Sequence, residues 1–294
     1  MIKVAPSVLS ADYLNLKEQL KALEEGNADW LHFDVMDGQF VPNLTFGPKI
    51  LGDMSKGCSL FKDVHIMVEH PLTVAPWFTD ADLITFHYEA LDDISASITL
   101  IHSLNKQAGI SVKPKTDVTL LTPYLDQVEL VLVMSVEPGF GGQKFMADML
   151  EKVRWLKQYR EEKGLSYVIE IDGGINGDTA KLAAEAGCDI LVAGSYVFKG
   201  DIKEKIRTLH FSSIRFAFEA ENRRAAAYDD DKCIGVCEFS EEKEKRNITH
   251  TGVDSAYQGL GIAKEMLNLI VEKSREESKE LSASCSYAKK YLEK

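Results

Sequence analysis

Short apolar runs alternate with amphipathic stretches through the first 210 residues of the chain, and this alternation constrains the fold more than any other feature. Eight runs have the length and composition of buried strands. Eight strands with intervening helices in about 210 residues predict an α/β fold of the (β/α)8 TIM barrel type. An open, doubly wound sheet is the alternative, but it needs fewer strands and a reversal of strand order. The predicted strands are Lys3–Ser7, Trp30–Met36, Phe61–Met67, Leu83–His87, Gly109–Lys113, Leu130–Ser135, Tyr167–Asp172 and Ile190–Gly194.

The intervening stretches have helical periodicity, and glycine or polar residues end most of them. The predicted helices include Leu14–Glu25, Ile94–Gln107, Phe145–Lys163, Asn176–Ala186 and Ile202–Leu209.

Polar residues and methionines gather where the predicted strands end. In the second strand His32, Asp34 and Met36 share one face, because side chains alternate along a strand. A buried structural His–Asp pair and a metal or acid–base site are equally compatible with this strand alone. The strand ends of a barrel carry its chemistry, and the other strands also end in such residues, which favours a functional site. These residues are Ser7, His65, Met67, His87, Met134, Asp172, Gly194 and Ser195.

Two imidazoles and two carboxylates in this set suit a divalent metal: zinc, iron, manganese or cobalt. The predicted ligands are His32, Asp34, His65 and Asp172. Asp34 and Asp172 would also serve as proton acceptor and donor on opposite faces of a substrate, which inverts a carbon next to a carbonyl. We expect His87 to be a core histidine with its hydrogen bonds satisfied, not a group that acts on the metal site.

Met36, Met67 and Met134 would exclude water from the site while adapting to the shape of the ligand; ordinary core filling is the alternative.

Glycine-bearing loops follow the sixth, seventh and eighth predicted strands. Such loops let backbone N–H groups approach an anion, and barrel enzymes commonly bind phosphate after the seventh and eighth strands. The sequence therefore predicts a phosphate site formed by Gly141, Gly142, Gly173, Gly174, Gly194 and Ser195.

Residues 1 to about 210 resemble the ribulose-phosphate 3-epimerase family along its whole length. The resemblance implies interconversion of D-ribulose 5-phosphate and D-xylulose 5-phosphate with a divalent metal. It also implies that His32, Asp34, His65 and Asp172 are the ligands, that Asp34 and Asp172 are the acid–base pair, and that Ser7 and the glycine loops contact the substrate. The matching stretches are Pro6–Asp12, His32–Pro48, Val64–Val68, Met134–Phe145 and Ile171–Asn176.

Some positions depart from the family pattern: Gln39 stands where many members have His, Glu137 replaces a frequent Asn, and Val112–Lys115 replaces a small-apolar Asn-Pro stretch. Allulose-6-phosphate 3-epimerase activity is therefore an alternative. A metal-independent phosphate-binding lyase is another alternative, with Lys113 or Lys115 at a strand end.

After Leu209 the pattern changes, and we place a domain boundary there, giving domains 1–210 and 211–294. The strand-like runs and the final helical stretch of the second region predict a small α+β domain. Its predicted elements are the strands Phe211–Phe218 and Cys233–Phe239 with a turn at Asp229–Asp231, a polar link at Ser240–Arg246, a strand at Asn247–Val253 and a helix at Gly261–Lys279.

A Q-x-x-G-x-A pattern opens the last predicted helix, where free N–H groups favour a pyrophosphate. It resembles the acetyl-CoA loop of the GNAT acetyltransferase family, which implies acetyl-CoA as a ligand; we favour binding over acetyl transfer. Cys285 is either a nucleophile or, as we prefer, a small buried residue. The loop residues are Gln258, Gly259, Gly261, Ile262 and Ala263.

Composition limits the partners. A net charge of −12 argues against nucleic acid or an anionic membrane surface. No apolar run approaches the roughly 20 residues of a membrane span, and the first residues lead directly into a strand pattern without a signal peptide. Five cysteines without a CxxC pair indicate free thiols in a reducing compartment. We therefore expect a cytoplasmic enzyme for a phosphosugar, assembled as a homo-oligomer.

Overall fold

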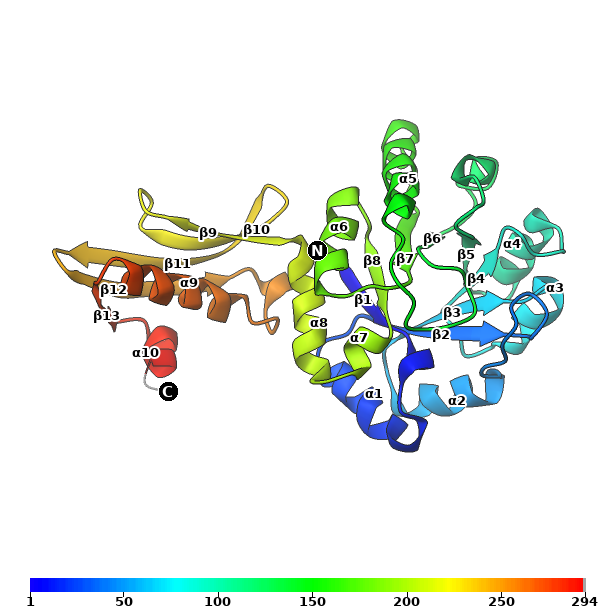
Figure 1. Ribbon diagram of the computed structural model, residues 1–294, viewed down its shortest axis with the longest axis horizontal. Coiled ribbons are helices and arrows are strands. Elements are labelled where there is room, and N and C mark those ends of the chain that lie inside the picture. The colour runs from blue at the N-terminus through cyan, green and yellow to red at the C-terminus, as the bar shows by residue number, and fades with distance from the viewer. Residues whose placement is uncertain (293–294) are drawn as a thin grey trace. The chain divides into compact units, whose positions relative to one another are not determined.

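The computed structural model describes residues 1–292, and the chain forms two compact units, each with its own sheet (Figure 1). The first unit spans Ile2–Ser212. The second unit comprises Met1 and the chain from Ser213 onward.

The first unit is a nearly closed barrel of parallel strands, as the alternation predicts. The strands are paired in the order β1-β8-β7-β6-β5-β4-β3-β2. A parallel bridge between Ser7 and His32 connects the first and last strands of this series. Each strand begins and ends within two residues of its predicted range. The strands are β1 Lys3–Pro6, β2 Trp30–Met36, β3 Phe61–Met67, β4 Leu83–His87, β5 Gln107–Val112, β6 Leu130–Met134, β7 Val168–Asp172 and β8 Ile190–Ala193.

Helices surround the strands, and short polar side chains cap several of them. Asn176 caps α6 by accepting from the backbone N–H of Thr179, whose hydroxyl in turn accepts from the N–H of Asn176. Asp93 and Asp201 cap α4 and α8. The helices are α1 Leu16–Glu25, α2 Pro48–Gly57, α3 Pro71–Val74, α4 Ile94–Ser103, α5 Leu150–Lys163, α6 Gly177–Ala186, α7 Ser195–Phe198 and α8 Ile202–His210.

The predicted helix ends were partly wrong. The first turns of the stretches predicted at Leu14 and Phe145 are separate 3-10 turns or loop. Helix α4 ends at Ser103, two residues before Asn105 turns the chain with a φ of +59°. The helices α2 and α3 were not predicted. Each begins with proline in its first turn, which is a start signal that the sequence carried.

The barrel has apolar layers on both sides of its strands. Outward-facing side chains such as Ile66 and Ile110 pack with helix residues such as Leu23 in one large cluster. Inside, Trp30 and Leu130 at the starts of their strands belong to a separate cluster. This cluster extends from the strand starts to Met134 and Val136 at the C-terminal end of β6, so apolar and polar side chains share the C-terminal half of the barrel.

The second unit is a five-stranded sheet of order β13-β12-β11-β10-β9. Strands β9 to β12 form antiparallel pairs, and β13 joins β12 in parallel after α9. The buried side of α9 carries Ile262, Met266, Leu267 and Ile270, the spacing of one helix face. The elements are β9 Ile214–Glu219, β10 Arg224–Asp229, β11 Lys232–Glu242, β12 Lys245–Val253, α9 Ile262–Glu276, β13 Glu280–Ala283 and α10 Ser286–Leu292.

Several details predicted for the second unit were wrong, although its α+β class was right. Phe211–Ser213 is a 3-10 turn, so the first strand starts at Ile214. Strand β10 was missed because alanine, present at three successive positions (225–227), has low strand propensity; all three are fully buried. Ser240–Arg246 is the tip of the β11–β12 hairpin, not a link, and α9 is shorter than the predicted Gly261–Lys279.

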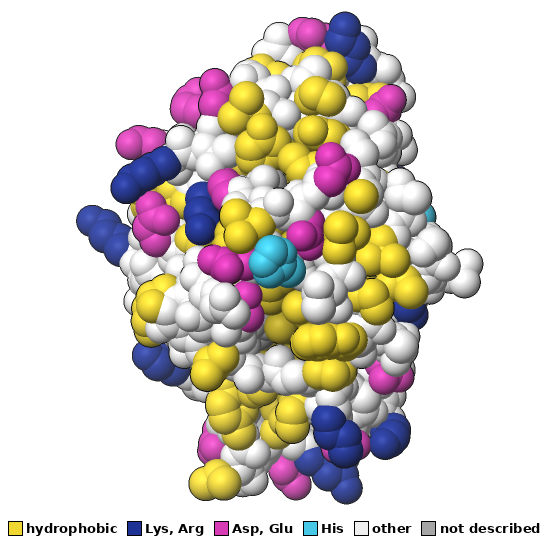
Figure 2. All heavy atoms as spheres, turned by 90° about the vertical axis from the view of Figure 1, so that its right-hand side faces the viewer, with side chains coloured by type: hydrophobic (Ala, Val, Ile, Leu, Met, Phe, Trp, Pro, Cys, Tyr) yellow, Lys and Arg dark blue, Asp and Glu magenta, His cyan; other side chains and the backbone are white. Residues whose placement is uncertain are grey.

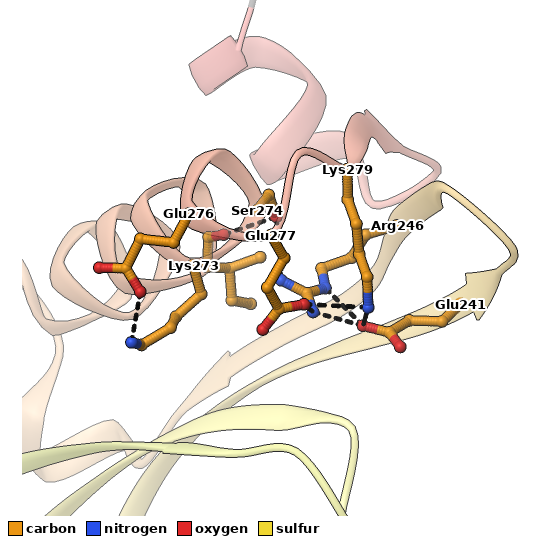
Figure 3. A network of polar contacts seen from close by, with 8 residues as sticks. Glu241, Arg246, Lys273, Ser274, Glu276, Glu277 and Lys279 are labelled. Atoms are coloured by element: carbon orange, nitrogen blue, oxygen red, sulfur yellow. Dashed lines mark hydrogen bonds and ion pairs between the residues drawn. The ribbon is translucent and has the colours of Figure 1, made fainter.

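A buried arginine holds the second unit together (Figure 3). Arg246 on β12 is 1% exposed, and its guanidinium lies 5.0 and 4.6 Å from the ring centroids of Phe218 and Phe239. It forms ion pairs with Glu241 and, at 2.7 Å, with Glu277 after α9. This cation therefore links the two-residue aromatic stack, the β11–β12 hairpin and the end of α9.

Hydrophobic side chains are also exposed on the surface, in small groups among acidic and basic ones (Figure 2). Leu14, Leu44 and Leu91 are more than two-thirds exposed. Within residues 1–292, no helix is both long and apolar enough to cross a membrane. All five cysteines are free thiols.

Candidate active site

Four of the predicted polar residues meet at the C-terminal ends of β2, β3 and β7. Strand register brings Asp34 directly opposite His65. Oδ1 of Asp34 lies 3.0 Å from Nδ1 of His65 and 3.3 Å from Nε2 of His32. Ser7 donates its hydroxyl to Oδ2 of Asp34 at 2.6 Å. One potential ligand atom from each of His32, Asp34, His65 and Asp172 lies within 4.8 Å of the others.

The surroundings of His32 leave one of its ring nitrogens available for a metal. Its ring is fully buried, and Nδ1 is 2.5 Å from Oδ2 of Asp63, which lies opposite it on β3. Nε2 is close to Asp34 but has no hydrogen-bond partner. An unpartnered buried nitrogen is costly unless it has a ligand. With two imidazoles and two carboxylates at this separation, the site fits a divalent cation.

The two aspartates have opposite electrostatic environments. Burial alone would raise the pKa of Asp34, but His32 and His65 lower it well below its usual value through charge and hydrogen bonds. Burial and then the charge of Asp34 raise the pKa of Asp172 to about 7. At neutral pH one carboxylate is ionised while the other can hold or release a proton, which is the pattern of an acid–base pair.

Two buried carboxyl groups below this site were not among the predicted residues. Asp63 shares a strand face with His65, and Glu170 shares one with Asp172, so strand alternation contained the signal. Both are completely buried, and burial followed by the charge of Asp63 raises the pKa of Glu170 well above its usual value. Oε1 of Glu170 lies 4.0 Å from Nδ1 of His32.

His87 is a buried histidine with both ring nitrogens in hydrogen bonds, as expected, but one of its partners is the predicted ligand His65. Its Nε2 lies 2.9 Å from Nε2 of His65, and its Nδ1 lies 3.2 Å from Oε2 of Glu89. Burial lowers the pKa of His87 to about 4, so the ring is neutral at neutral pH. The register of β3 and β4 explains the contact, because His65 lies opposite Thr85 and His87 follows two residues later on the same face.

A cleft with about 560 Å³ of empty space opens above the aspartates. His65 lies behind Asp34 and does not line the cleft, and His32 is likewise buried. Ser10 and Phe140 line it and were not predicted. The other predicted substrate residues all line it, namely Ser7, Met36, Met67, Met134, Gly141, Gly142, Gly173, Gly174, Gly194 and Ser195.

One end of the cleft is formed by the glycine loops. At Gly174 φ is +66°, and a Cβ atom there would lie 2.4 Å from the backbone nitrogen of Phe145, so only glycine fits. A second cavity shares Gly142, Gly174 and Ser195 with the cleft and is also lined by Lys199 and Lys205. The glycine end is therefore the cationic and N–H-rich end of the site.

In the second unit, the predicted acetyl-CoA loop lies between a 3-10 turn and α9. Gly259 and Gly261 have φ of +86° and +89°, and Gly261 caps α9 without a side-chain hydrogen bond. Ile262 and Ala263 follow in the first turn of the helix, whose N–H groups have no carbonyl partner within the helix. Gln258 donates its side-chain amide to the carbonyl of Val253 at 3.4 Å.

Cys285 precedes α10 and is partly exposed, not buried. Burial raises its pKa, but the backbone N–H groups of Ala288 and Tyr287 and the hydroxyl of Thr251 bring the net value below that of an ordinary thiol.

Comparison with known proteins identifies the first unit. The model of the ribulose-phosphate 3 epimerase family matches residues 3–198. The chain belongs to the ribulose-phosphate 3-epimerase family. The ribulose-phosphate 3-epimerase of Bacillus subtilis is 44% identical over 216 residues, which cover 72% of this chain and 100% of that enzyme. The enzyme of Treponema pallidum is 45% identical over 202 residues, 68% of this chain and 93% of that enzyme.

Solved structures with low sequence identity to this chain share the fold of its first unit. KGPDC from Streptococcus mutans superposes with a TM-score of 0.53 at 14% identity, covering 72% of this chain and 97% of that chain. Phosphoribosyl anthranilate isomerase from Thermus thermophilus superposes with a TM-score of 0.52 at 12% identity, covering 72% and 98%. The model of a second family, GCN5-related N-acetyl-transferase, matches residues 223–294.

Proposed function

We propose that the barrel epimerises D-ribulose 5-phosphate to D-xylulose 5-phosphate at C3. The observation that supports this most directly is the pair of cleft-lining carboxyl groups, Asp34 and Asp172, whose pKa values are displaced in opposite directions. Inversion at C3 needs a base on one face of the carbon and an acid on the other. The relatives named above are ribulose-phosphate 3-epimerases, which is consistent with this reaction.

The residues of the chain would divide the work as follows. The loops at Gly142 and Gly174 bind the phosphate through backbone N–H groups and hold C3 between the aspartates. The ionised Asp34 accepts the C3 proton, and Asp172 returns a proton to the opposite face; the roles exchange in the reverse direction. Met36 and its neighbours exclude water from the reacting carbon, so that the two carboxyl groups, and not bulk water, protonate it.

A divalent metal fits this scheme. When bound by His32, Asp34, His65 and Asp172, zinc, iron, manganese or cobalt would supply positive charge next to the substrate oxygen atoms that become negative in an enediolate. Ser7, which donates to Asp34, keeps that carboxylate oriented.

Isotope exchange tests the proposal. In D2O the enzyme should exchange the C3 hydrogen of ribulose 5-phosphate, and Asp34→Asn or Asp172→Asn should each reduce turnover by about 10²- to 10⁴-fold. Chelation should abolish turnover, and one divalent metal should restore it. Full turnover in either variant would disprove the two-carboxylate scheme. Faster turnover of allulose 6-phosphate than of ribulose 5-phosphate would reassign the substrate.

For the second unit we propose acetyl-CoA binding at Gln258, Gly259, Gly261, Ile262 and Ala263. The support is the family match and a glycine-capped helix start that presents free N–H groups to a pyrophosphate. Calorimetric titration of the full chain with acetyl-CoA should show binding, and Gly261→Ala should weaken it because alanine is strained at φ of +89°. Absence of binding in the unmodified chain would contradict this assignment.

We also propose that the protein is a cytoplasmic homo-oligomer. Free thiols at all five cysteines support a reducing compartment. Light scattering of the purified chain tests the oligomer, and a monomeric mass would contradict it.

A further inference from the structure

A chain of hydrogen bonds leads away from the proposed metal site, from β3 to the C-terminal end of β4. It runs from Nδ1 of His65, through Nε2 of His65 and Nε2 of His87 at 2.9 Å, to Nδ1 of His87 and Oε2 of Glu89 at 3.2 Å. Both rings are completely buried. The other carboxylate oxygen, Oε1 of Glu89, accepts from the backbone N–H of Lys113 at 2.8 Å and from the hydroxyl of Thr116.

This chain of hydrogen bonds has a defined polarity because its outer end only accepts. Glu89 is an ionised carboxylate whose Oε1 already receives two donors, so its Oε2 faces His87 as an acceptor. Nδ1 of His87 must therefore carry the hydrogen, which leaves a lone pair on Nε2 in the neutral ring. With that hydrogen on Nδ1 of His87, Nε2 of His65 donates across the 2.9 Å contact, and Nδ1 of His65 turns its lone pair toward the metal site. Nδ1 of His65 also lies 3.0 Å from Oδ1 of Asp34, so without a metal this carboxylate competes for a hydrogen on Nδ1.

We propose that Glu89 and His87 are positioning residues that favour the Nε2–H tautomer of His65 over the Nδ1–H tautomer that Asp34 stabilises, so that Nδ1 offers its lone pair when a metal binds. This inference rests on the proposed metal-dependent function and names the residues that maintain one of its ligands. Asp63 orients His32 in a similar way. Its Oδ2 accepts a hydrogen bond from Nδ1 of His32, which leaves Nε2 of His32 without a partner. Partners of this kind typically contribute 10- to 100-fold to metal affinity.

An isosteric substitution should invert the hydrogen bonds. In Glu89→Gln, the amide oxygen must replace Oε1, since it has to accept from Lys113 and Thr116, and the NH2 group then faces His87. His87 would accept at Nδ1 and donate at Nε2. His65 would then carry its hydrogen on Nδ1, where it obstructs the metal.

Two variants of His87 separate geometry from packing. In His87→Gln, the amide oxygen can accept from Nε2 of His65 while its NH2 group donates to Glu89, so the polarity is retained. His87→Leu fills similar space but removes both hydrogen bonds. As a matched control, His102→Leu removes another histidine–glutamate pair, between His102 and Glu129 at 3.0 Å on the barrel surface.

The experiment is a Co²⁺ titration of the metal-free full-length protein, followed by visible absorption and competed with a chelator. We expect Glu89→Gln and His87→Leu to lower Co²⁺ affinity by about 10- to 100-fold, and His87→Gln and His102→Leu to stay within about threefold of the unmodified chain. Long-range ¹H–¹⁵N spectra of the Zn²⁺-loaded protein should show hydrogen on Nε2 of His65.

Affinity unchanged in both Glu89→Gln and His87→Leu would overturn the proposal, as would hydrogen on Nδ1 of His65 in the unmodified protein. Epimerase assays on the same samples distinguish the two levels of inference. A protein that binds Co²⁺ in the expected order but does not epimerise ribulose 5-phosphate keeps the positioning roles and loses the proposed function. An active enzyme whose affinity does not follow that order keeps the function and loses the positioning roles.

Discussion

Replacing Asp172 by asparagine should stabilise the metal-free barrel at neutral pH while strongly reducing its turnover. The carboxyl group is forced toward its neutral form by burial and by the charge of Asp34, so its pKa is about 7 in the fold against 3.8 in the unfolded chain. A group whose pKa is raised in the folded state stabilises the fold below its unfolded pKa, and that stabilisation is lost as pH rises through the folded pKa. The relevant window is therefore pH 4 to 7.

The size of the effect follows from the shift. About three pKa units at about 1.4 kcal/mol each amount to about 4 kcal/mol of unfolding free energy lost by the unmodified protein across this window. Asp172 is partly exposed, and solvent screening reduces the figure, so we expect between about 2 and 4 kcal/mol. Asparagine has the same shape and no charge. The stability difference between Asp172→Asn and the unmodified chain should therefore grow by this amount from pH 4 to pH 8 and then become constant.

Tryptophan fluorescence during urea unfolding measures this difference in the barrel alone. All three tryptophans, Trp30, Trp77 and Trp155, lie in the first unit. Asp178→Asn, which changes an exposed carboxylate in the first turn of α6, is the matched control, and its stability gap should change by no more than about 1 kcal/mol over the same pH range. A gap for Asp172→Asn that stays constant between pH 4 and pH 8 would refute the reasoning. Added divalent metal should reverse the order of stability, because only the unmodified chain has the full ligand set.

Three further changes test other parts of the structure. Arg246→Met should destabilise the second unit by about 1 to 3 kcal/mol, because it removes the charge-assisted hydrogen bonds of the guanidinium to Glu241 and Glu277, while Lys279 still pairs with both carboxylates. Faster hydrogen exchange in β11 and β12 with unchanged barrel fluorescence would show this, and unchanged exchange would contradict it. Gly174→Ala should raise KM for the phosphosugar roughly tenfold or more, because the added Cβ meets the backbone of Phe145; an unaltered KM would argue against phosphate binding there. Lys205→Met should raise KM by roughly three- to fivefold, because it removes a cation beside the phosphate. Lys203→Met, which loses only an exposed ion pair with Glu25, is the control and should leave KM unchanged. Equal effects of the two substitutions would place the phosphate elsewhere.

Much of the barrel could be inferred from local patterns. A strand buried on both faces reads as an apolar run, so the strands were located within two residues. The phase of side chains along a strand is also local, which is why the sequence alone assigns His32 and Asp34 to one face. The glycine loops after the last strands were visible for the same reason, since positive φ selects glycine.

Cross-strand partners depend on register, which no single segment encodes. Asp63 lies opposite His32, and His87 lies diagonal to His65, only because β2, β3 and β4 are aligned as they are. A lone acidic residue in a strand looks the same in the sequence whether it faces solvent, a helix or a histidine. Tertiary packing also overrode weak propensity in β10, where buried alanines lie in the middle of a sheet. Local chemistry therefore specified most of the residues that line the cleft, whereas the register of the closed sheet specified which buried groups lie beside them.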